Sequence, residues 1–323
     1  MNILVVGSSV IDLFLEIEDK NHIKTYQDSI LLKLGDKIPV DMKKITLGGD
    51  GANVSVGLKR LSMNTTFFTF FGSDLFSKEV EETLRKEEVK LIVEREGAKC
   101  SLSIIFNFDS DRIIFSHREE RSHDFYYNEE NLPDFVYLAS IGKKWEDAYS
   151  KVLDFTKKNN IPMGFTPGSP QLKENSGILI DSLKNSKIVF INREEAEKIL
   201  SFRNISYKDD IKDVLSKMKT LGMEVLSITD GLSGAYALDN NENFYFIKSF
   251  GEGAAERTGA GDAYASGFLS SYLLGFDIPE CMRRGCFNAN SVVSKIGAQE
   301  GLLTKEEMDK ISKENPNFKA IKI

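Results

Sequence analysis

The sequence predicts an α/β fold in which helices cover a central, mainly parallel sheet. Short apolar runs alternate with helical patterns along most of the 323 residues, and a parallel sheet with covering helices requires this alternation. The chain has 41% hydrophobic and 28% charged residues, which is typical of a soluble globular protein. Its length suits one large domain, so we expect a single domain over residues 1–323.

The predicted strands of this sheet are short apolar runs that helical patterns separate. In chain order they are Asn2–Val6, Thr65–Phe71, Lys90–Glu94, Phe135–Ser140, Pro162–Phe165, Ile188–Asn192 and Glu224–Thr229. Phe76, Val80 and Leu84 recur at four-residue spacing, which indicates one of the intervening helices.

Two parts of the chain interrupt the alternation. Residues 13–18 and 38–45 are typical of extended chain. Ser101–Phe108 and Arg112–Ser116 are typical of a hairpin, with the polar turn Asp109-Ser110-Asp111 between its strands. These segments stand outside the pattern of the main sheet.

Charge, cysteine content and hydropathy exclude several classes of protein. A net charge of −7 argues against a nucleic-acid-binding protein, which usually carries a basic face. Cys100, Cys281 and Cys286 have no metal-ligand spacing and do not suggest a disulfide framework. Asp12 interrupts the first apolar stretch, which argues against a signal peptide. Because no apolar run reaches about 18 residues, we expect a cytoplasmic protein that does not contact a membrane.

Residues 257–263 form the most informative segment, because small residues lead there directly into a helical pattern. Gly259, Ala260 and Gly261 leave consecutive backbone N–H groups unobstructed, and the N-terminus of a helix attracts an anion. Asp262 is an unusual residue for an anion site. Its presence is explained if it takes a proton from a hydroxyl group that attacks a phosphoryl group. The alternative is that Asp262 caps the helix.

A second glycine-rich turn, at residues 47–54, also opens a helical pattern. Gly48 and Gly49 let the backbone approach a ligand closely. The amide of Asn53 offers both hydrogen-bond donors and acceptors to such a ligand. Alone, a glycine cluster usually makes a turn and nothing more.

Together, and in this order, the two turns resemble the signatures of the ribokinase-like (PfkB) carbohydrate kinase family. The resemblance extends over almost the whole chain, from about Ile3 to Met308. It implies a three-layer αβα fold with a small β-sheet lid, formed here by residues 13–46 and 100–118. It also implies an ATP-dependent kinase that uses Mg²⁺. In that family the lid often forms the dimer contact, so the resemblance implies a homodimer through the lid.

The resemblance also assigns roles to individual residues. Asp262 would be the general base, and the backbone of residues 259–261 would stabilise the charge on the phosphoryl group. The residues expected to bind the acceptor are Asp12, Gly48, Gly49 and Asn53. Those expected to contact ATP are Asn192, Thr229, Gly231, Gly234 and, on the adenine side, Asn288. Glu195 is expected to organise Mg²⁺, which prefers oxygen ligands.

Two of these assignments have structural alternatives. Asn192 can instead be a helix N-cap, with Glu195 completing a capping box. The segment Thr229–Ala235 matches a Thr-x-Gly-x-x-Gly element of the family that lies along the nucleotide phosphates. Its alternative is a simple turn between two strands.

The chain departs from the family pattern just before Gly259. The family usually has Asp-Thr-x-Gly-Ala-Gly-Asp, whereas this chain has Glu256-Arg257-Thr258 before the glycine. The leading aspartate often takes part in a potassium site, so the departure argues against potassium activation. Arg257 has two interpretations, which the sequence leaves open: a bidentate phosphate contact or a solvated surface residue.

The expected function follows from this resemblance and from two missing motifs. The sequence contains no P-loop, and no Gly-x-Gly-x-x-Gly follows its first strand. We expect ATP-dependent phosphorylation of a hydroxymethyl group on a small sugar. The alternative acceptor is a nucleoside such as adenosine, whose base needs an apolar or aromatic slot. A non-catalytic sugar or nucleotide sensor is the hypothesis from another class.

Overall fold

A ten-stranded sheet organises the fold in the computed structural model, which describes residues 1–26, 29–95, 99–108, 111–251 and 257–323. In spatial order its strands are β16 (Ile321–Lys322), β15 (Phe244–Ile247), β14 (Ala235–Leu238), β13 (Val225–Thr229), β12 (Ile188–Asn192), β11 (Met163–Phe165), β10 (Phe135–Leu138), β1 (Asn2–Ser8), β6 (Asn64–Phe70) and β7 (Lys90–Glu94). The strands from β13 to β7 are parallel, and β14, β15 and β16 extend the sheet in antiparallel fashion. The prediction of a mainly parallel sheet is therefore confirmed.

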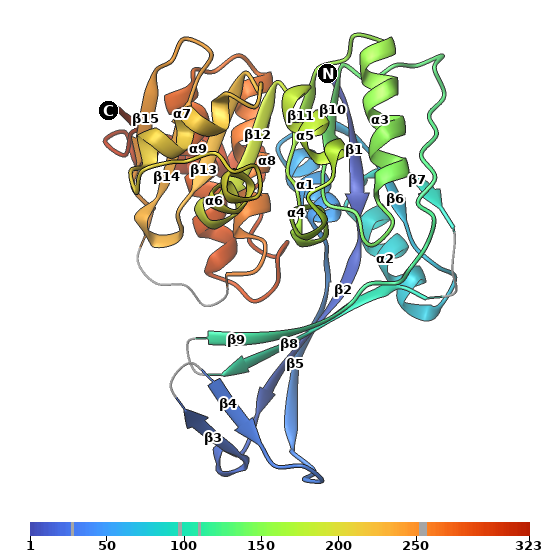
Figure 1. Cartoon of the computed structure of the whole chain (residues 1–323). Helices are drawn as coiled ribbons and strands as arrows, with labels where there is room; N and C mark the ends of the chain where they lie inside the picture. Colours follow the sequence, from blue (N-terminus) through green and yellow to red (C-terminus); the bar gives the residue numbers. More distant parts are fainter. Residues whose placement is uncertain (27–28, 96–98, 109–110, 252–256) are drawn as a thin grey trace.

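Helices cover both faces of this sheet and complete three layers (Figure 1). One face carries α1 (Asp50–Arg60), α2 (Leu75–Lys86), α8 (Ala260–Leu273) and α9 (Ile278–Val293). The other carries α3 (Glu146–Lys158), α4 (Ser169–Glu174), α5 (Gly177–Lys184), α6 (Arg193–Phe202) and α7 (Ile211–Lys219). A last helix, α10 (Lys305–Glu314), packs through Met308 against a small cluster with Leu61 and Phe287.

The central strands are apolar on both sides because each side meets a layer of helices. In β1, Ile3 and Val5 belong to one core cluster, whereas Leu4 and Val6 belong to the other. All four are at most 1% exposed. Such continuous apolar runs are typical of parallel strands buried on both faces, which explains why these strands could be predicted from the sequence.

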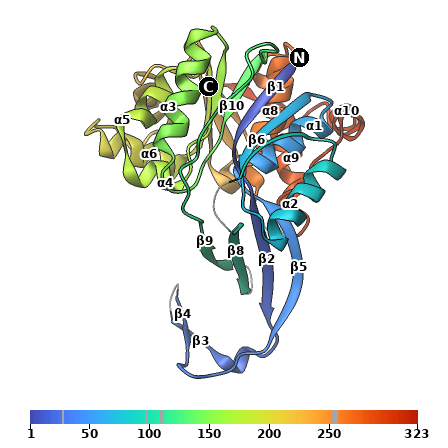
Figure 2. The ribbon, with the colours of Figure 1, turned by 90° about the vertical axis from the view of Figure 1, so that its right-hand side faces the viewer.

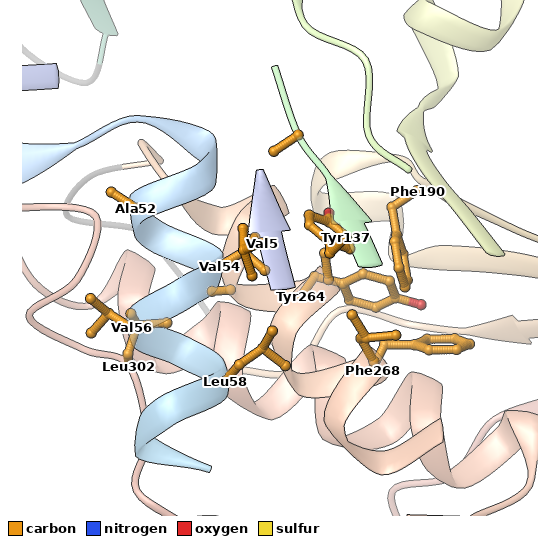
Figure 3. Packing of buried hydrophobic residues seen from close by; sticks show 14 of the residues in the cluster. Val5, Ala52, Val54, Val56, Leu58, Tyr137, Phe190, Tyr264, Phe268 and Leu302 are labelled. Atoms are coloured by element: carbon orange, nitrogen blue, oxygen red, sulfur yellow. The ribbon is translucent and has the colours of Figure 1, made fainter. Parts of the chain in front are cut away.

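Helices α1 and α8 pack closely against one another on the same face of the sheet. Figure 3 shows Val54 and Leu58 of α1 beside Tyr264 and Phe268 of α8, with Tyr137 of β10 completing the group. A Cβ atom added to Gly57 of α1 would lie 2.4 Å from Ser266 Oγ of α8. The absence of a side chain at that glycine permits the close approach, which brings the N-termini of the two helices together.

A second, smaller sheet projects from the layered body (Figures 1 and 2). Its strand order is β5 (Val40–Gly48), β2 (Val10–Ile17), β8 (Ser101–Phe108) and β9 (Asp111–His117). We call these four strands the lid sheet. Strand β2 follows β1 almost directly, so the chain passes from the central sheet into the lid sheet within two residues. The predicted hairpin is β8–β9; of its turn, Asp109 and Ser110 lie outside the described residues.

Several elements were not predicted. Residues 20–26 and 29–32 form a short 3₁₀ turn, η1 (Lys20–His22), and a separate antiparallel pair of strands, β3 (Ile23–Tyr26) and β4 (Ser29–Leu32). A further 3₁₀ turn, η2 (Gly231–Ser233), precedes β14. Strands β14, β15 and β16 at the sheet edge were also missed. Within the described parts of the chain, no helix combines the length and apolar character needed to cross a membrane.

Candidate active site

The candidate site lies where the parallel strands of the central sheet reach their carboxyl ends. Ser8 ends β1, Asn192 ends β12 and Thr229 ends β13, all at the same edge because the strands are parallel. The two glycine-rich turns reach this edge from α1 and α8. Ligands of open α/β sheets typically bind in this position.

Both helices begin at a glycine in a conformation that other residues rarely adopt. Gly49 precedes α1 with φ 96°, and Gly259 precedes α8 with φ 79°. A Cβ atom on Gly49 would lie 2.7 Å from the carbonyl oxygen of Ser8, and one on Gly259 would lie 2.5 Å from Cβ of Ala298. The glycines therefore serve both the backbone turn and the close packing around it.

Asn53 and Asp262 connect the two turns directly. Asn53 is 3% exposed and donates a hydrogen bond from Nδ2 to Oδ2 of Asp262, over 2.8 Å. Its amide oxygen accepts a hydrogen bond from Nε2 of Gln299 at 3.0 Å. The acceptor-binding residue and the base expected from the sequence are thus in contact, and Asp262 is positioned at the first turn of α8.

Asp12 reaches the same region from the lid sheet. It lies on β2, opposite Thr46 of β5 and Ser103 of β8, and only 5% of it is exposed. A Cβ atom on Gly48 would lie 1.9 Å from Oδ2 of Asp12. Gly48 therefore makes room for this carboxylate at the base of the lid, which explains why a glycine is needed there.

Neighbouring negative charges raise the pKa values of Asp262 and Glu195 in this site. Burial, followed by the negative charge of Asp50, raises the pKa of Asp262 well above its ordinary value, and Glu195 and Asp12 add to the effect. The hydrogen bond from Asn53 acts in the opposite direction. Burial also raises the pKa of Asp50. Asp50 lies inside the glycine motif, but the sequence analysis gave it no role.

Arg118 is a second site residue that sequence reasoning missed. It follows β9 and donates hydrogen bonds to the carbonyl oxygen of Leu102 and to Oγ of Ser103, both at 3.3 Å. Burial lowers its pKa, whereas the charges of Asp12 and Asp50 raise it. No spacing in the sequence relates Arg118 to these carboxylates, because three separate strands and helices bring them together.

A cavity of about 720 Å³ opens beside these groups. Its lining includes Gly49 and Asp50 from the first glycine turn, Arg118 after β9, Ser140 after β10 and Ser169 at the start of α4. Among the described residues that line it, none is Phe, Tyr or Trp. Of the residues expected to bind the acceptor, Gly49 lines this cavity, together with the charged side chains of Asp50 and Arg118.

Asn192 and Glu195 form the capping box that was the structural alternative for them. Asn192 Oδ1 accepts from the Glu195 backbone N–H, and Glu195 Oε2 accepts from the Asn192 backbone N–H, each at 2.9 Å. Burial raises the pKa of Glu195 to about 7, and the hydrogen bond from Asn192 lowers it in part. Capping and a role near phosphates are compatible, because a carboxylate has further lone pairs.

The turn from Thr229 to Gly234 lies next to this capping box. Arg193 Nη1 approaches Oδ2 of Asp230 at 3.7 Å and links the two segments. Gly231 is exposed with φ 53°, whereas Gly234 is buried with φ 110°. A Cβ atom on Gly234 would lie 2.1 Å from the carbonyl oxygen of Ile247. This turn therefore has a fixed backbone shape beside the carboxyl end of β12.

The start of α8 presents backbone donors. The N–H groups of Gly261 and Asp262 have no backbone acceptor among the residues that the structure describes, as expected for the first turn of a helix. A Cβ atom on Gly261 would meet nothing within 4 Å. The Ala260 N–H, in contrast, bonds to the carbonyl oxygen of Arg257 at 3.3 Å. Of the expected donors at residues 259–261, the Ala260 N–H is thus engaged within the turn, and Asp262 adds a further N–H group without a backbone acceptor among the described residues.

Asn288, expected on the adenine side, makes its hydrogen bonds inside the protein. It is fully buried, and Nδ2 donates to the carbonyl oxygen of Ala263 at 2.9 Å and to Oγ of Ser266 at 3.1 Å. Its amide oxygen accepts from the Leu303 backbone N–H at 2.9 Å. The side chain thereby joins α8 and α9 to the C-terminal turn.

The structure describes only part of the segment before Gly259 in which the sequence departs from the family pattern. Arg257 is exposed, and Glu256 lies outside the described residues. Within the described ranges, no group of three or more His, Cys, Asp or Glu side chains is arranged to hold a metal ion by itself. Any metal here would need oxygen ligands from phosphates or water as well as from protein carboxylates.

Comparison with known proteins identifies a family and a fold. A family model described as pfkB family carbohydrate kinase matches residues 2–305. The chain is 28% identical to a nucleoside kinase of Methanocaldococcus jannaschii, over 81% of this chain and 83% of that protein. It is 23% identical to a 5-dehydro-2-deoxygluconokinase of Bacillus subtilis, over 82% and 86%. A solved structure of Arabidopsis thaliana ribokinase, complexed with ribose and ATP, matches with a TM-score of 0.79 at 19% identity, covering 96% of this chain and 97% of that one. The predicted ribokinase-like fold is confirmed.

Proposed function

We propose, from the premise that this chain belongs to the pfkB family of carbohydrate kinases, that it phosphorylates a hydroxymethyl group of a small sugar with Asp262 as general base. The observation that supports this most is the hydrogen bond between Asn53 and Asp262. It joins the turn expected to bind the acceptor to the residue expected to take its proton. An acceptor hydroxyl bound at one residue would then lie within reach of the other.

Asp262 is suited to proton transfer by its surroundings. Burial and the neighbouring carboxylates, Asp50 foremost, raise its pKa above the ordinary value. A base works best when its pKa lies near the operating pH, because it must be ionised and still bind a proton well. The hydrogen bond from the amide of Asn53 favours the ionised form.

The backbone at the start of α8 would stabilise the transferred phosphoryl group. The N–H groups of Gly261 and Asp262 lack backbone acceptors among the described residues. The space beside Gly261 is open, because a Cβ atom there would meet nothing within 4 Å. Donors fixed in this way can stabilise negative charge without rearranging. The positive end of the α8 dipole acts in the same direction.

The nucleotide would lie along Thr229, Gly231 and Gly234, beside Asn192 and Glu195. The ATP dependence belongs to the family, and Mg²⁺ fits beside Glu195, because the negative charges of Asp50 and Glu194 act on this partly buried carboxylate and favour a cation there. Mg²⁺ commonly uses one or two carboxylates and completes its ligands with phosphates and water. Bound there, it would neutralise phosphate charge; Glu195 would orient its water ligands.

A sugar is favoured over a nucleoside as acceptor by the polar cavity. Asp12 and Asp50 can accept hydrogen bonds from sugar hydroxyls, and Arg118 can donate one. None of the described lining residues is Phe, Tyr or Trp, so the lining offers a base only the small imidazole ring of His117 for stacking. Because the chain is similar to a nucleoside kinase of M. jannaschii, a nucleoside remains the alternative acceptor.

A homodimer through the lid sheet is supported by the outer face of that sheet. Cross-strand pairing places Leu13 beside Ile45 and Ile104, and Ile104 beside Phe115, all on the face opposite Asp12. Ile45 is 45% exposed and Phe115 is 56% exposed. An apolar row of this kind on the surface is typical of an interaction site, and a second lid presents the same surface.

The experiment that tests the proposed function is ADP release with Mg-ATP against a panel of free sugars, sugar phosphates and nucleosides, with and without potassium. We expect turnover with a free sugar, and ³¹P NMR of the product should show a phosphate ester on a CH₂OH group. Turnover with nucleosides alone would replace the sugar by the alternative. Acceptor binding without any ADP release would favour the non-catalytic sensor.

A further inference from the structure

We propose that Gln299 is a positioning residue of this active site, which holds the amide of Asn53 with its N–H group turned toward Asp262. The inference rests on the proposed function, in which Asp262 is the base. Gln299 itself need not touch the acceptor or ATP. It acts through Asn53, on which both the acceptor turn and the base depend.

Asn53 has two polar ends, and each has one partner in the protein. Nδ2 donates to Asp262 at 2.8 Å, and Oδ1 accepts from Gln299 at 3.0 Å. An asparagine amide turned by 180° keeps its shape but exchanges donor and acceptor. In the turned form, the amide oxygen would face the carboxylate of Asp262 and repel it. The donor from Gln299 therefore selects the orientation that an ionised base requires.

Hydrogen bonds from Arg60 hold the turn that carries Gln299 in place. Arg60 Nη1 donates to the Gln299 carbonyl oxygen at 2.8 Å and to that of Leu302 at 3.0 Å. Arg60 is itself held by Glu87, through two hydrogen bonds of 2.9 and 2.6 Å. Gln299 is 8% exposed, so its side chain has little freedom to leave Asn53.

The same turn contacts both the helix of the base and the lid. Ala298, the neighbour of Gln299, lies where a Cβ atom on Gly259 would approach to 2.5 Å. Glu300, the neighbour on the other side, forms an ion pair with Lys44 of β5 at 2.9 Å. The position of Gln299 is thus set by elements that also set the base and the lid. Glu300 offers a control on the same turn, because its carboxylate pairs with Lys44 and lies outside the contacts that link Gln299, Asn53 and Asp262.

The charged and titratable groups that act on Asp262 come from four elements. Asp50 from α1, Glu195 from α6 and Asp12 from β2 raise the pKa of Asp262. The charge of Asp262 in turn raises the pKa of the Tyr137 phenol on β10. Of the groups described around Asp262, the Asn53 amide is the one that favours the ionised form. Losing that orientation should make the base harder to ionise.

The first variant to measure is Gln299→Glu, which keeps the size of the side chain but replaces the donor by an acceptor. A carboxylate at position 299 attracts the N–H group of Asn53 and turns its oxygen toward Asp262. We expect kcat to fall about tenfold and the acid limb of the kcat profile to move up by about one pH unit. The KM for ATP should stay within about twofold of the wild-type value, because ATP binding does not involve this amide.

Two further measurements separate positioning from a structural effect. Gln299→Met should also lower kcat, but in the Asn53→Ala background it should add less than about a twofold loss, because its effect passes through Asn53. Glu300→Gln, which disturbs the same turn, should leave the pH profile in place. Full additivity of the two losses, or equal profiles for Gln299→Glu and the wild type, would overturn the proposal.

The last measurement does not need turnover. The side-chain amide resonances of Asn53, followed by ¹H–¹⁵N NMR against pH in the unliganded protein, report the titration of Asp262. We expect their midpoint to rise by about one pH unit in Gln299→Glu. If the wild type releases no ADP with any acceptor, the proposed function fails, while this shift still decides the role of Gln299. An unchanged midpoint would overturn it.

Discussion

Asn53 donates a hydrogen bond to Asp262 over 2.8 Å, although 209 positions separate the two residues in the chain. The contact exists because α1 and α8 lie side by side, with Gly57 permitting the close approach of Ser266. Each helix begins at a glycine-rich turn, so packing the helices together also brings the turns together. The acceptor side and the base side of the site are therefore joined by the core of the protein.

The requirement for glycine at position 48 can be tested with Gly48→Ala. The added methyl group would overlap Oδ2 of Asp12, at a distance of 1.9 Å, and would displace that carboxylate. We expect kcat/KM for the acceptor to fall at least about tenfold, with the KM for ATP unchanged. The matched control is Gly177→Ala at the start of α5, where a methyl group meets nothing within 4 Å. Equal acceptor kinetics for both variants would contradict the role given to Asp12.

The pH dependence of kcat should follow the ionisation of Asp262. Because the ionised form is the base, kcat falls as the pH decreases through the raised pKa of Asp262. Asp50→Asn removes the charge that contributes most to this shift after burial, so the acid limb should move to lower pH. Asp50→Glu keeps the charge and should keep the limb near its original place. A limb that does not move in Asp50→Asn would show that Asp50 does not act on the base.

The ionisation of Glu195 should make the free energy of unfolding depend on pH. Its pKa in the folded state is about 7, above the ordinary 4.5, so the folded state binds more protons than the unfolded state between these values. The free energy of unfolding must then decrease as pH rises through this window, and the loss is complete above about pH 7.

Glu195→Gln removes this loss and retains an oxygen for the Asn192 backbone N–H. We expect its melting temperature to exceed that of the wild type at pH 8 and to match it at pH 4.5, in thermal unfolding followed by circular dichroism. Glu194→Gln, at the exposed neighbouring position, should show a much smaller gain, because Glu194 only adds its charge to the causes that raise the pKa of Glu195. A higher melting temperature for Glu195→Gln at both pH values would point to a cause other than ionisation.

The apolar row on the outer face of the lid sheet predicts a dimer. The wild type should have about twice the 36.3 kDa mass of the chain in light scattering coupled to size exclusion. Phe115→Asp places a charge in the row, at its most exposed position on the edge strand β9, and should give the mass of one chain. Leu274→Asp changes an equally exposed apolar residue at the end of α8 and should remain dimeric. A monomeric wild type would rule out the lid contact.

The strands and glycine turns could be predicted because their signals are local. A buried parallel strand such as β1 is continuously apolar from Ile3 to Val6, and the turns at Gly49 and Gly259 need a residue that tolerates positive φ. The antiparallel strands β14 and β15 were missed because each has only four residues, and β15 is in addition only partly buried, which weakens their pattern.

The rest of the site depends on contacts that no local pattern reveals. Arg118 meets Asp12 and Asp50 only through the arrangement of the lid, and Gln299 meets Asn53 across 246 positions. Asn288 was placed near adenine because its segment resembles one that flanks that site. Its full burial and internal hydrogen bonds could not be read from the residue type.

The most direct test of the account is the turnover of Asp262→Asn with the acceptor that the wild type phosphorylates. The amide oxygen of the new side chain can still accept from Asn53, so the variant should fold and keep its KM for ATP. It cannot take the acceptor proton, and kcat should fall about 10³-fold, within the range that a general base contributes. A folded variant with near-wild-type kcat would contradict the assignment of Asp262 as the base, and with it the mechanism proposed for this site.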